Sequence, residues 1–127
     1  MQNKPMNLML NFWAPREDAH IPDFNQDWSK GMDDSKMPFY AIFEDVKVYS
    51  YNEVSKTFEL DWSDDFSGST LDESKWTVAE NVGWDTNLST FYSSQYYVKD
   101  NKLTLVMEHT PSPGIGPSFL AYSHFLN

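Results

Sequence analysis

The sequence of 127 residues contains no cysteine, few basic side chains and no long apolar run. Without cysteine there is no disulfide framework or thiol chemistry, and the cellular compartment cannot be inferred from redox usage. Nine Lys and Arg residues stand against nineteen acidic ones, and the resulting net charge of −10 repels phosphate groups. Nucleic acids and anionic membranes are therefore not expected as partners.

The first twelve residues also lack the features of a targeting segment. They contain one Lys, and Asn7 and Asn11 interrupt their apolar stretch. The stretch is too short and too polar for a signal-peptide core or a membrane span. If the native protein is exported, we expect its signal to lie outside this sequence.

No segment of ten or more residues repeats its apolar residues with a helical period. Residues 14–36 are rich in Pro, Asp, Asn and Ser and predict a long loop. Residues 99–102 predict a hairpin turn. Alternating apolar and polar residues predict strands at 5–13, 37–51 (one long strand or a pair), 57–62, 75–78, 91–98 and 102–109. The sequence is therefore expected to fold as an all-β protein.

Aromatic residues make up 17% of the chain, with five Trp and seven Tyr. A core of this size needs few of them, because Trp and Tyr carry polar atoms that need hydrogen-bond partners. Some of these rings are therefore expected to face a ligand or a partner surface. The length permits either a small complete domain or part of a larger one.

Two blocks of the sequence resemble opposite ends of one enzyme family. The later block resembles the beginning of the family 16 glycoside hydrolases, the β-glucanases that include lichenases and laminarinases; it reads D-W-x-D-D-F-x-G-x-x-L-D-x-S-K-W at 61–76 and F-Y-S-S-Q-Y-Y-V-K-D-N-K-L-T-L at 91–105. The earlier block resembles the end of that family, with M-N-L-M-L-N-F-W at 6–13 and W-S-K-G through V-K-V-Y at 28–49. The resemblance implies part of a concanavalin-like jelly-roll β-sandwich with antiparallel sheets.

In this chain the family's end precedes its beginning, which is the order of a circular permutant; a 1,3-1,4-β-glucanase of the family is known in that order. The resemblance implies one partial domain over residues 1–110, with family C-terminal strands at 1–51, a connector at 52–56 and family N-terminal strands at 57–110. Because the first and last strands of a jelly roll lie close together, a short connector can join them. Residues 111–127 match nothing in the family and form a tail of unknown role.

The catalytic pattern of the family is missing. Retaining glycosidases need two carboxyl groups about 5–5.5 Å apart, and family 16 supplies both from one strand as E-x-D-x-E. No two Glu residues stand four apart around an Asp in this chain, and in the permuted order the catalytic strand would precede Met1. No catalytic residue is therefore assigned.

Residues that contact sugar in the family have counterparts here. Aromatic rings bind the apolar faces of glucose, and amide side chains hydrogen-bond its hydroxyls. The resemblance implies that glucan contacts come from Asn11, Trp13, Trp28 and Trp84, whereas Met9 stands where the permuted relative carries Arg. For each of these Trp residues the alternative is core packing. Core packing is the expected role of Trp62 and Trp76.

The family also carries a structural calcium ion, held mainly by backbone carbonyls and one acidic side chain. Carried over by resemblance, the metal positions are Glu44, Asp65 and Asn101. Hard oxygen ligands suit calcium, although acidic turns are commonly only solvated. The three His residues are far apart in the sequence and lack the spacing of zinc ligands.

Three hypotheses for function follow from the resemblance. The first is that the chain is part of an endo-β-glucanase that hydrolyses 1,3-1,4- or 1,3-β-glucan with retention, and that it lacks catalysis alone. The second is a non-catalytic, lectin-like module that binds β-glucan. The third is a structural piece that associates with itself or a partner chain through unpaired strand edges. The family resemblance also implies an extracellular location.

Overall fold

The computed structural model describes residues 7–15, 33–84, 87–109, 118–119 and 121–125. A three-residue 3-10 helix, η1 (Asp34–Lys36), accompanies ten strands: β1 (Asn7–Asn11), β2 (Phe39–Phe43), β3 (Val46–Asn52), β4 (Thr57–Asp64), β5 (Thr77–Val78), β6 (Thr90–Phe91), β7 (Tyr96–Lys99), β8 (Lys102–Met107), β9 (Ser118–Phe119) and β10 (Ala121–Phe125). The all-β prediction is confirmed. No helix in the described ranges is long and apolar enough to cross a membrane.

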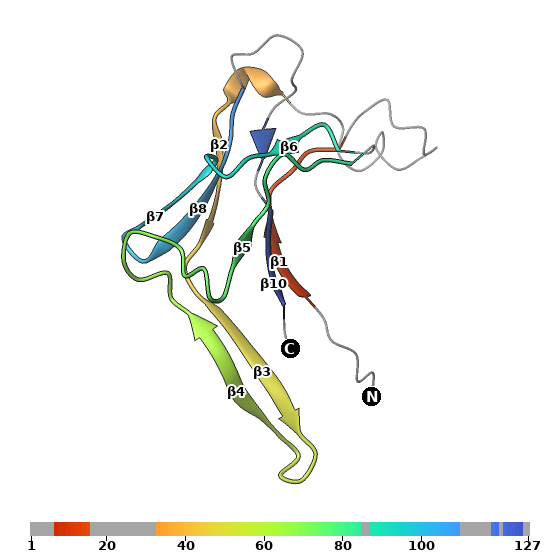
Figure 1. Cartoon of the computed structure of the whole chain (residues 1–127), viewed down its shortest axis with the longest axis vertical. Coiled ribbons are helices and arrows are strands. Elements are labelled where there is room, and N and C mark those ends of the chain that lie inside the picture. The colour runs from red at the N-terminus through yellow and green to blue at the C-terminus, as the bar shows by residue number, and fades with distance from the viewer. Residues whose placement is uncertain (1–6, 16–32, 85–86, 110–117, 120, 126–127) are drawn as a thin grey trace.

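Two three-stranded antiparallel sheets make up the body of the protein (Figure 1). One has the order β1-β10-β5 and the other β2-β8-β7. The strands β3 and β4 form a separate hairpin, and β6 and β9 form a short parallel pair. This arrangement is a partial β-sandwich of the jelly-roll type.

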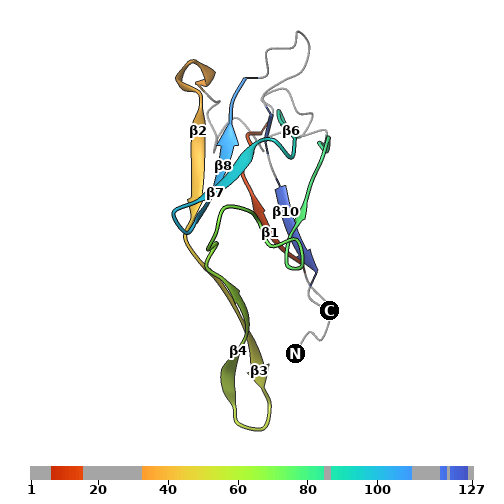
Figure 2. The same cartoon turned by 60° about the vertical axis from the view of Figure 1, so that its left-hand side comes forward.

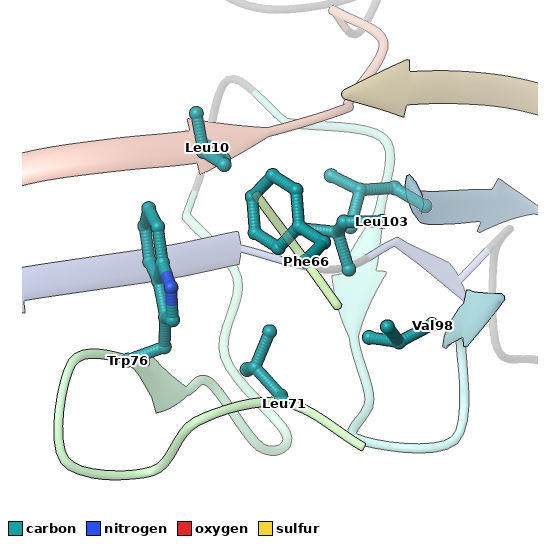
Figure 3. Packing of buried hydrophobic residues seen from close by; sticks show 7 residues of the cluster. Leu10, Phe66, Leu71, Trp76, Val98 and Leu103 are labelled. Carbon is teal, nitrogen blue, oxygen red and sulfur yellow. The ribbon is translucent and has the colours of Figure 1, made fainter. Parts of the chain in front are cut away.

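The core lies between the two three-stranded sheets. In β8, Leu103, Leu105 and Met107 alternate toward it and are buried. Leu10 of β1 approaches from the other sheet, and the segment between β4 and β5 adds Trp76 and further apolar side chains (Figure 3). The period-2 pattern read from the sequence therefore places one face of β8 inside the sandwich.

The predicted turn between β7 and β8 is confirmed. Lys99 pairs with Lys102, which leaves a two-residue loop. Asp100 and Asn101 have φ values of 53° and 55°. Positive φ at both central residues is the requirement of a type I′ turn, and Asp and Asn tolerate that conformation better than most residues.

Residues 37–51 form a pair of strands, β2 and β3, and not one long strand. The connector expected at 52–56 is the turn of the β3–β4 hairpin, although Asn52 itself still pairs with Thr57. Figures 1 and 2 show this hairpin extending away from the rest of the chain.

Two strand predictions were wrong in detail. Residues 91–98 do not form one strand, because a turn closed by the hydrogen bond from Gln95 N to Tyr92 O separates β6 from β7. The strand expected at 75–78 contains only Thr77 and Val78. The preceding residues instead form a turn in which the backbone N–H of Trp76 donates to the Asp72 carbonyl.

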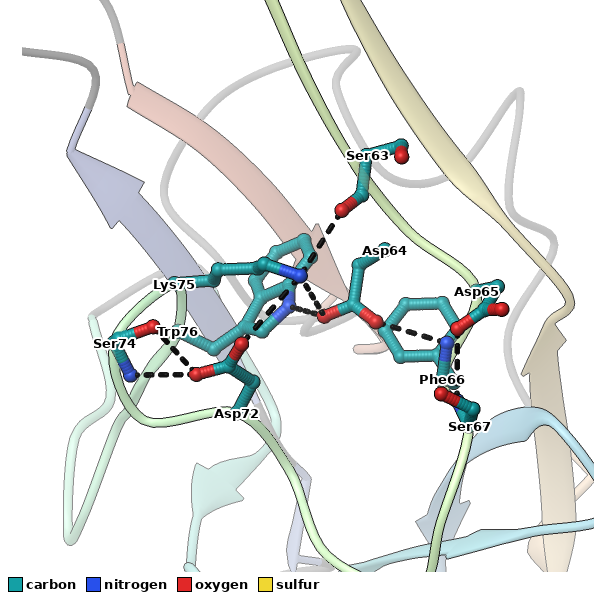
Figure 4. A network of polar contacts seen from close by, with 9 residues as sticks. All are labelled: Ser63, Asp64, Asp65, Phe66, Ser67, Asp72, Ser74, Lys75 and Trp76. Atoms are coloured by element: carbon teal, nitrogen blue, oxygen red, sulfur yellow. Dashed lines mark hydrogen bonds and ion pairs between the residues drawn. The ribbon is translucent and has the colours of Figure 1, made fainter.

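The motif at 61–76 forms a buried corner around Asp64 (Figure 4). One carboxylate oxygen of Asp64 accepts from the Trp76 indole N–H at 2.7 Å, and the other accepts from the Phe66 backbone N–H at 2.8 Å. The Lys75 ammonium lies 4.0 Å from the same carboxylate and also bonds the Ser63 carbonyl at 3.0 Å. This part of the family-like motif therefore holds the fold together at the end of β4.

The tail contributes backbone to both the sandwich and the parallel pair. β10 pairs along all five residues of β1 and with both residues of β5. The sequence predicts no role for residues 111–127, so the pairing of β10 is a finding of the structure.

Candidate functional site

The chain that leaves β1 runs beside the residues that precede β6. The Leu88 N–H donates to the Ala14 carbonyl at 2.9 Å, and the Ala14 N–H donates to Ser89 Oγ at 3.4 Å. Pro15 forms an isolated antiparallel bridge with Asn87. These contacts join segments about seventy residues apart in the sequence.

This pairing brings together two of the aromatic residues that the resemblance assigns to glucan binding. The rings of Trp13 and Trp84 lie edge to face, with centroids 5.3 Å apart and an interplanar angle of 70°. Trp84 also packs against Phe91, with ring centroids 5.3 Å apart and an interplanar angle of 30°. Phe91 is fully buried, whereas Trp84 is 42% exposed. A partly exposed indole offers apolar surface that can contact an apolar ligand face.

Asn87 lies beside this aromatic pair and was missed in the sequence. It is only 6% exposed, and its backbone N–H donates to the Trp84 carbonyl at 2.9 Å. Its Oδ1 accepts from the Ser89 N–H at 2.9 Å, while Nδ2 has no hydrogen-bond partner among the described residues. A buried amide donor without a partner is costly, so the Nδ2 group of Asn87 is an unusual feature of this segment. The one signal in the sequence was an amide two residues before a Ser, a pattern too common to single out.

Gln95 is a second buried amide in the described structure. Its Nε2 donates to Glu108 Oε1 at 2.8 Å, and its Oε1 has no partner there. The backbone on either side is fixed, because the Gln95 carbonyl accepts from the Val106 N–H at 2.9 Å. Gln95 precedes β7 and so belongs to the sheet opposite β1.

No contact with the Trp13–Trp84 pair is established for the other residues that were expected to bind sugar. Asn11 ends β1, is half-buried, and pairs with Ala121 of β10. No hydrogen bond links its side chain to Trp13 or Trp84 in the described structure. Met9, in the position of the relative's Arg, is exposed. Trp28 lies outside the described residues, so its expected contact stays a prediction.

The remaining two Trp residues pack with the core, as expected. Trp76 is buried, and Trp62 packs against the core cluster with its ring centroid 5.8 Å from that of Trp76. Their interplanar angle of 81° is an edge-to-face arrangement. The expectation that Trp62 and Trp76 pack in the core is therefore confirmed.

The three predicted metal positions lie at the ends of strands. Glu44 follows β2, Asp65 follows β4, and Asn101 occupies the β7–β8 turn. Glu44 Oε1 is engaged by the Lys102 ammonium at 2.8 Å, and Asp65 Oδ1 accepts from the Ser67 N–H at 3.1 Å. The described residues contain no group of three or more His, Cys, Asp or Glu side chains able to hold a metal. Carboxylate and amide oxygens suit calcium. The Lys102 ammonium would compete with calcium for the Glu44 carboxylate.

Three acidic side chains of the described residues have environments that bear on general acid catalysis. Asp64 is the one buried carboxylate among them, and both of its oxygens serve the corner at the end of β4. Hydrogen bonding to Ser74 lowers the pKa of Asp72, and hydrogen bonding to Ser93 lowers the pKa of Glu80. A general acid at neutral pH requires a raised pKa, so these groups are poorly suited to that role.

No protein-family model matches this chain. A β-glucanase of Fibrobacter succinogenes (strain ATCC 19169 / S85) is 30% identical to it over 104 residues, which cover 79% of this chain. The same residues cover 27% of that protein, so the chain spans about a quarter of the length of its relative. The chain is therefore glucanase-like in sequence.

Proposed function

We propose that this chain is part of a circularly permuted family 16 endo-β-glucanase and supplies aromatic and amide groups that bind the glucan. The complete enzyme would hydrolyse 1,3-1,4- or 1,3-β-glucan with retention. The chain alone would bind glucan without cleaving it. The observation that carries the proposal is the contact between Trp13 and the half-exposed Trp84, backed by the buried Phe91.

The chemistry of the surrounding groups supports sugar as the ligand. A glucose ring offers apolar C–H faces to indole and hydroxyl groups to amides. In this proposal Trp84 supplies the first kind of contact, and the Asn87 amide, whose backbone N–H bonds the Trp84 carbonyl, is the candidate for the second. A neutral polysaccharide is also compatible with a chain whose net charge is −10.

The hairpin between β3 and β4 supports the permuted order. Val48 lies opposite Trp62 and Tyr49 lies opposite Leu60, so the segments that resemble the family's last and first strands are antiparallel neighbours. Fusion of old termini through a four-residue turn requires this proximity. In this proposal the E-x-D-x-E strand belongs to polypeptide outside the chain.

Titration with mixed-linkage β-glucan oligosaccharides, followed by Trp fluorescence, tests the binding site. Trp84→Ala should weaken binding by about tenfold, which corresponds to about 1.4 kcal/mol. The control is Tyr97→Ala, because Tyr97 is 47% exposed on β7 and matches the exposure of Trp84. Equal affinities for wild type and Trp84→Ala would contradict the proposed site.

A non-catalytic glucan-binding module is the second candidate, favoured because both oxygens of Asp64, the one buried carboxylate of the described residues, are already hydrogen-bonded within the fold. A reducing-sugar assay on the same samples, with and without polypeptide that supplies the E-x-D-x-E strand, separates the two. Hydrolysis that appears only with the added polypeptide supports a part of an enzyme. Binding that never leads to hydrolysis supports the module.

Calcium and an extracellular site of action complete the proposal. The calcium would lie near Glu44, Asp65 and Asn101, and binding there would require Lys102 to leave Glu44. That displacement costs little, because an exposed ion pair contributes about 0–1 kcal/mol. In this proposal the protein acts on polysaccharide outside the cell.

A further inference from the structure

The segment after β1 and the segment before β6 are joined by hydrogen bonds that converge on Ala14. Its carbonyl accepts from the Leu88 N–H at 2.9 Å, and its N–H donates to Ser89 Oγ at 3.4 Å. The next residue is Pro15, which has no N–H, so the chain offers no backbone donor there. At Ala14 the Ser89 hydroxyl therefore takes the place that a backbone carbonyl occupies in an ordinary strand pair.

A second set of hydrogen bonds holds Ser89 itself. Its N–H donates to Asn87 Oδ1 at 2.9 Å, which is the contact of an Asx turn. The Asn87 N–H donates in turn to the Trp84 carbonyl at 2.9 Å. Hydrogen bonds thus lead from the backbone of Trp84 through Asn87 and Ser89 to Ala14, the residue that follows Trp13. We call Ala14, Asn87 and Ser89 the clamp.

The clamp is buried. Ser89 is 3% exposed, and Ala14 and Asn87 are 6% exposed. Breaking a hydrogen bond in such a place is costly, because the freed group cannot turn to water instead. The Ser89 hydroxyl is both buried and bonded to the Ala14 N–H, so Ser89 acts on a ligand only through the residues that it holds in place.

Ser89 also lies close to the backbone beside Trp84. A Cβ atom built on Gly83 would lie 3.2 Å from the Ser89 carbonyl oxygen, a tight contact that glycine avoids. The Phe91 N–H donates to the Val82 carbonyl at 2.8 Å and closes this segment on itself. Trp84 packs against Phe91, so one side of the aromatic pair is fixed within its own segment.

The position of Trp13 relative to Trp84 depends on how the two segments are joined. Trp13 packs against the core cluster that contains Phe91, but apolar packing is not directional. Hydrogen bonds have preferred distances and angles, and they set the register of one segment on the other. The edge-to-face contact of the two indoles, at 5.3 Å and 70°, therefore depends on the clamp.

We propose that Ser89 is a positioning residue for the aromatic pair, which fixes Trp13 against Trp84 without touching the ligand. Its effect on glucan binding rests on the proposed function of this site. Two segments that are locked together before the ligand arrives lose less conformational freedom on binding. Without the hydroxyl, the Ala14 N–H loses this acceptor, and the segment that carries Trp13 is held less firmly.

Circular dichroism of Ser89→Ala tests the geometry of the pair directly. Two indoles in contact give an exciton couplet whose amplitude depends on the distance and the angle between them. Trp62 and Trp76 form another edge-to-face pair, so the spectrum contains more than one such contribution. The difference between the wild type and Trp13→Phe identifies the part that comes from the contact with Trp84.

The matched control is Thr104→Val. It removes a hydroxyl from a side chain on β8 that is 4% exposed, compared with 3% for Ser89. Urea unfolding verifies that both variants are folded under the conditions of the measurement. Both are then titrated with mixed-linkage β-glucan oligosaccharides while Trp fluorescence is followed.

Ser89→Ala should reduce the couplet and weaken binding by about fivefold, a change of about 1 kcal/mol. The control should match the wild type in both measurements. An unchanged couplet in Ser89→Ala would overturn the proposal, and so would an equal loss in Thr104→Val. A reduced couplet with unchanged affinity would refute the role in binding. If the wild type binds no oligosaccharide, the proposed function fails, whereas the couplet still decides whether Ser89 positions the pair.

Discussion

The buried carboxylate of Asp64 gives the sharpest test of what holds this fold together. Asp64→Ala removes two charge-assisted hydrogen bonds, one from the Trp76 indole N–H at 2.7 Å and one from the Phe66 N–H at 2.8 Å. Hydrogen bonds to charged groups contribute about 1.5–3 kcal/mol each, and a buried donor left unpaired costs a similar amount. The Lys75 ammonium at 4.0 Å adds at most about 1 kcal/mol.

We therefore expect Asp64→Ala to lower the free energy of unfolding by about 3–5 kcal/mol, a large part of the ~5–15 kcal/mol of a typical domain. Asp64→Asn should cost about half as much, because the amide keeps one acceptor oxygen. Asp65→Ala is the control, since exposed Asp65 accepts one backbone hydrogen bond, from Ser67 at 3.1 Å; its cost should stay below about 1 kcal/mol.

Urea unfolding followed by far-UV circular dichroism measures these differences without relying on Trp76 as the reporter. The midpoint and the slope must both be fitted, because a changed slope indicates a loss of two-state behaviour. If Asp64→Ala unfolded within about 1 kcal/mol of the wild type, the corner around Asp64 would not be the support described.

Three further predictions concern turns, pH and metal. Asn101→Val should destabilise the chain by about 1–2 kcal/mol in urea unfolding, because Asn101 has φ 55°, whereas Asn101→Gly should be neutral or stabilising. Hydrogen bonding to Ser74 lowers the pKa of Asp72 below its ordinary value of 3.8. The stability from that contact is therefore present above this value and is lost as the pH falls through the lower, folded-state pKa. In acid titration, Asp72→Asn should lose stability less steeply than the wild type, and parallel stability curves would contradict the assignment. Calcium at about 100 times its dissociation constant should stabilise the chain by about 2.7 kcal/mol in thermal melts, with the gain lost in Glu44→Gln; identical melts in calcium and chelator would refute the site.

The strands could be predicted because their apolar residues alternate. In β8, Leu103, Leu105 and Met107 stand two apart and all face the core. The hairpin turn at 99–102 could also be predicted from local chemistry, since Asp and Asn are common turn residues, and Asp100 and Asn101 adopt positive φ. Strands and tight turns can be predicted from local patterns because they depend on residues that are close in the sequence.

Features that depend on distant contacts were missed. Asn87 is buried and forms a bridge with Pro15, a contact between segments about seventy residues apart that no local pattern indicates. The bulge in the β3–β4 hairpin was hidden by the regular spacing of Phe58, Leu60 and Trp62, which suggested a single aligned face. A one-residue register shift reverses the faces of a strand, and composition alone does not reveal it.

The central claim, that this chain binds β-glucan through Trp84 and its neighbours but does not cleave it, can be tested by one proton NMR titration. The anomeric resonances of a mixed-linkage glucan oligosaccharide report both binding and hydrolysis in the same sample. The account predicts that these resonances broaden or shift on addition of the chain, that Trp84→Ala reduces the effect, and that no new reducing-end signal grows with time. Unchanged resonances at saturating protein, or a growing reducing-end signal from the chain alone, would contradict it.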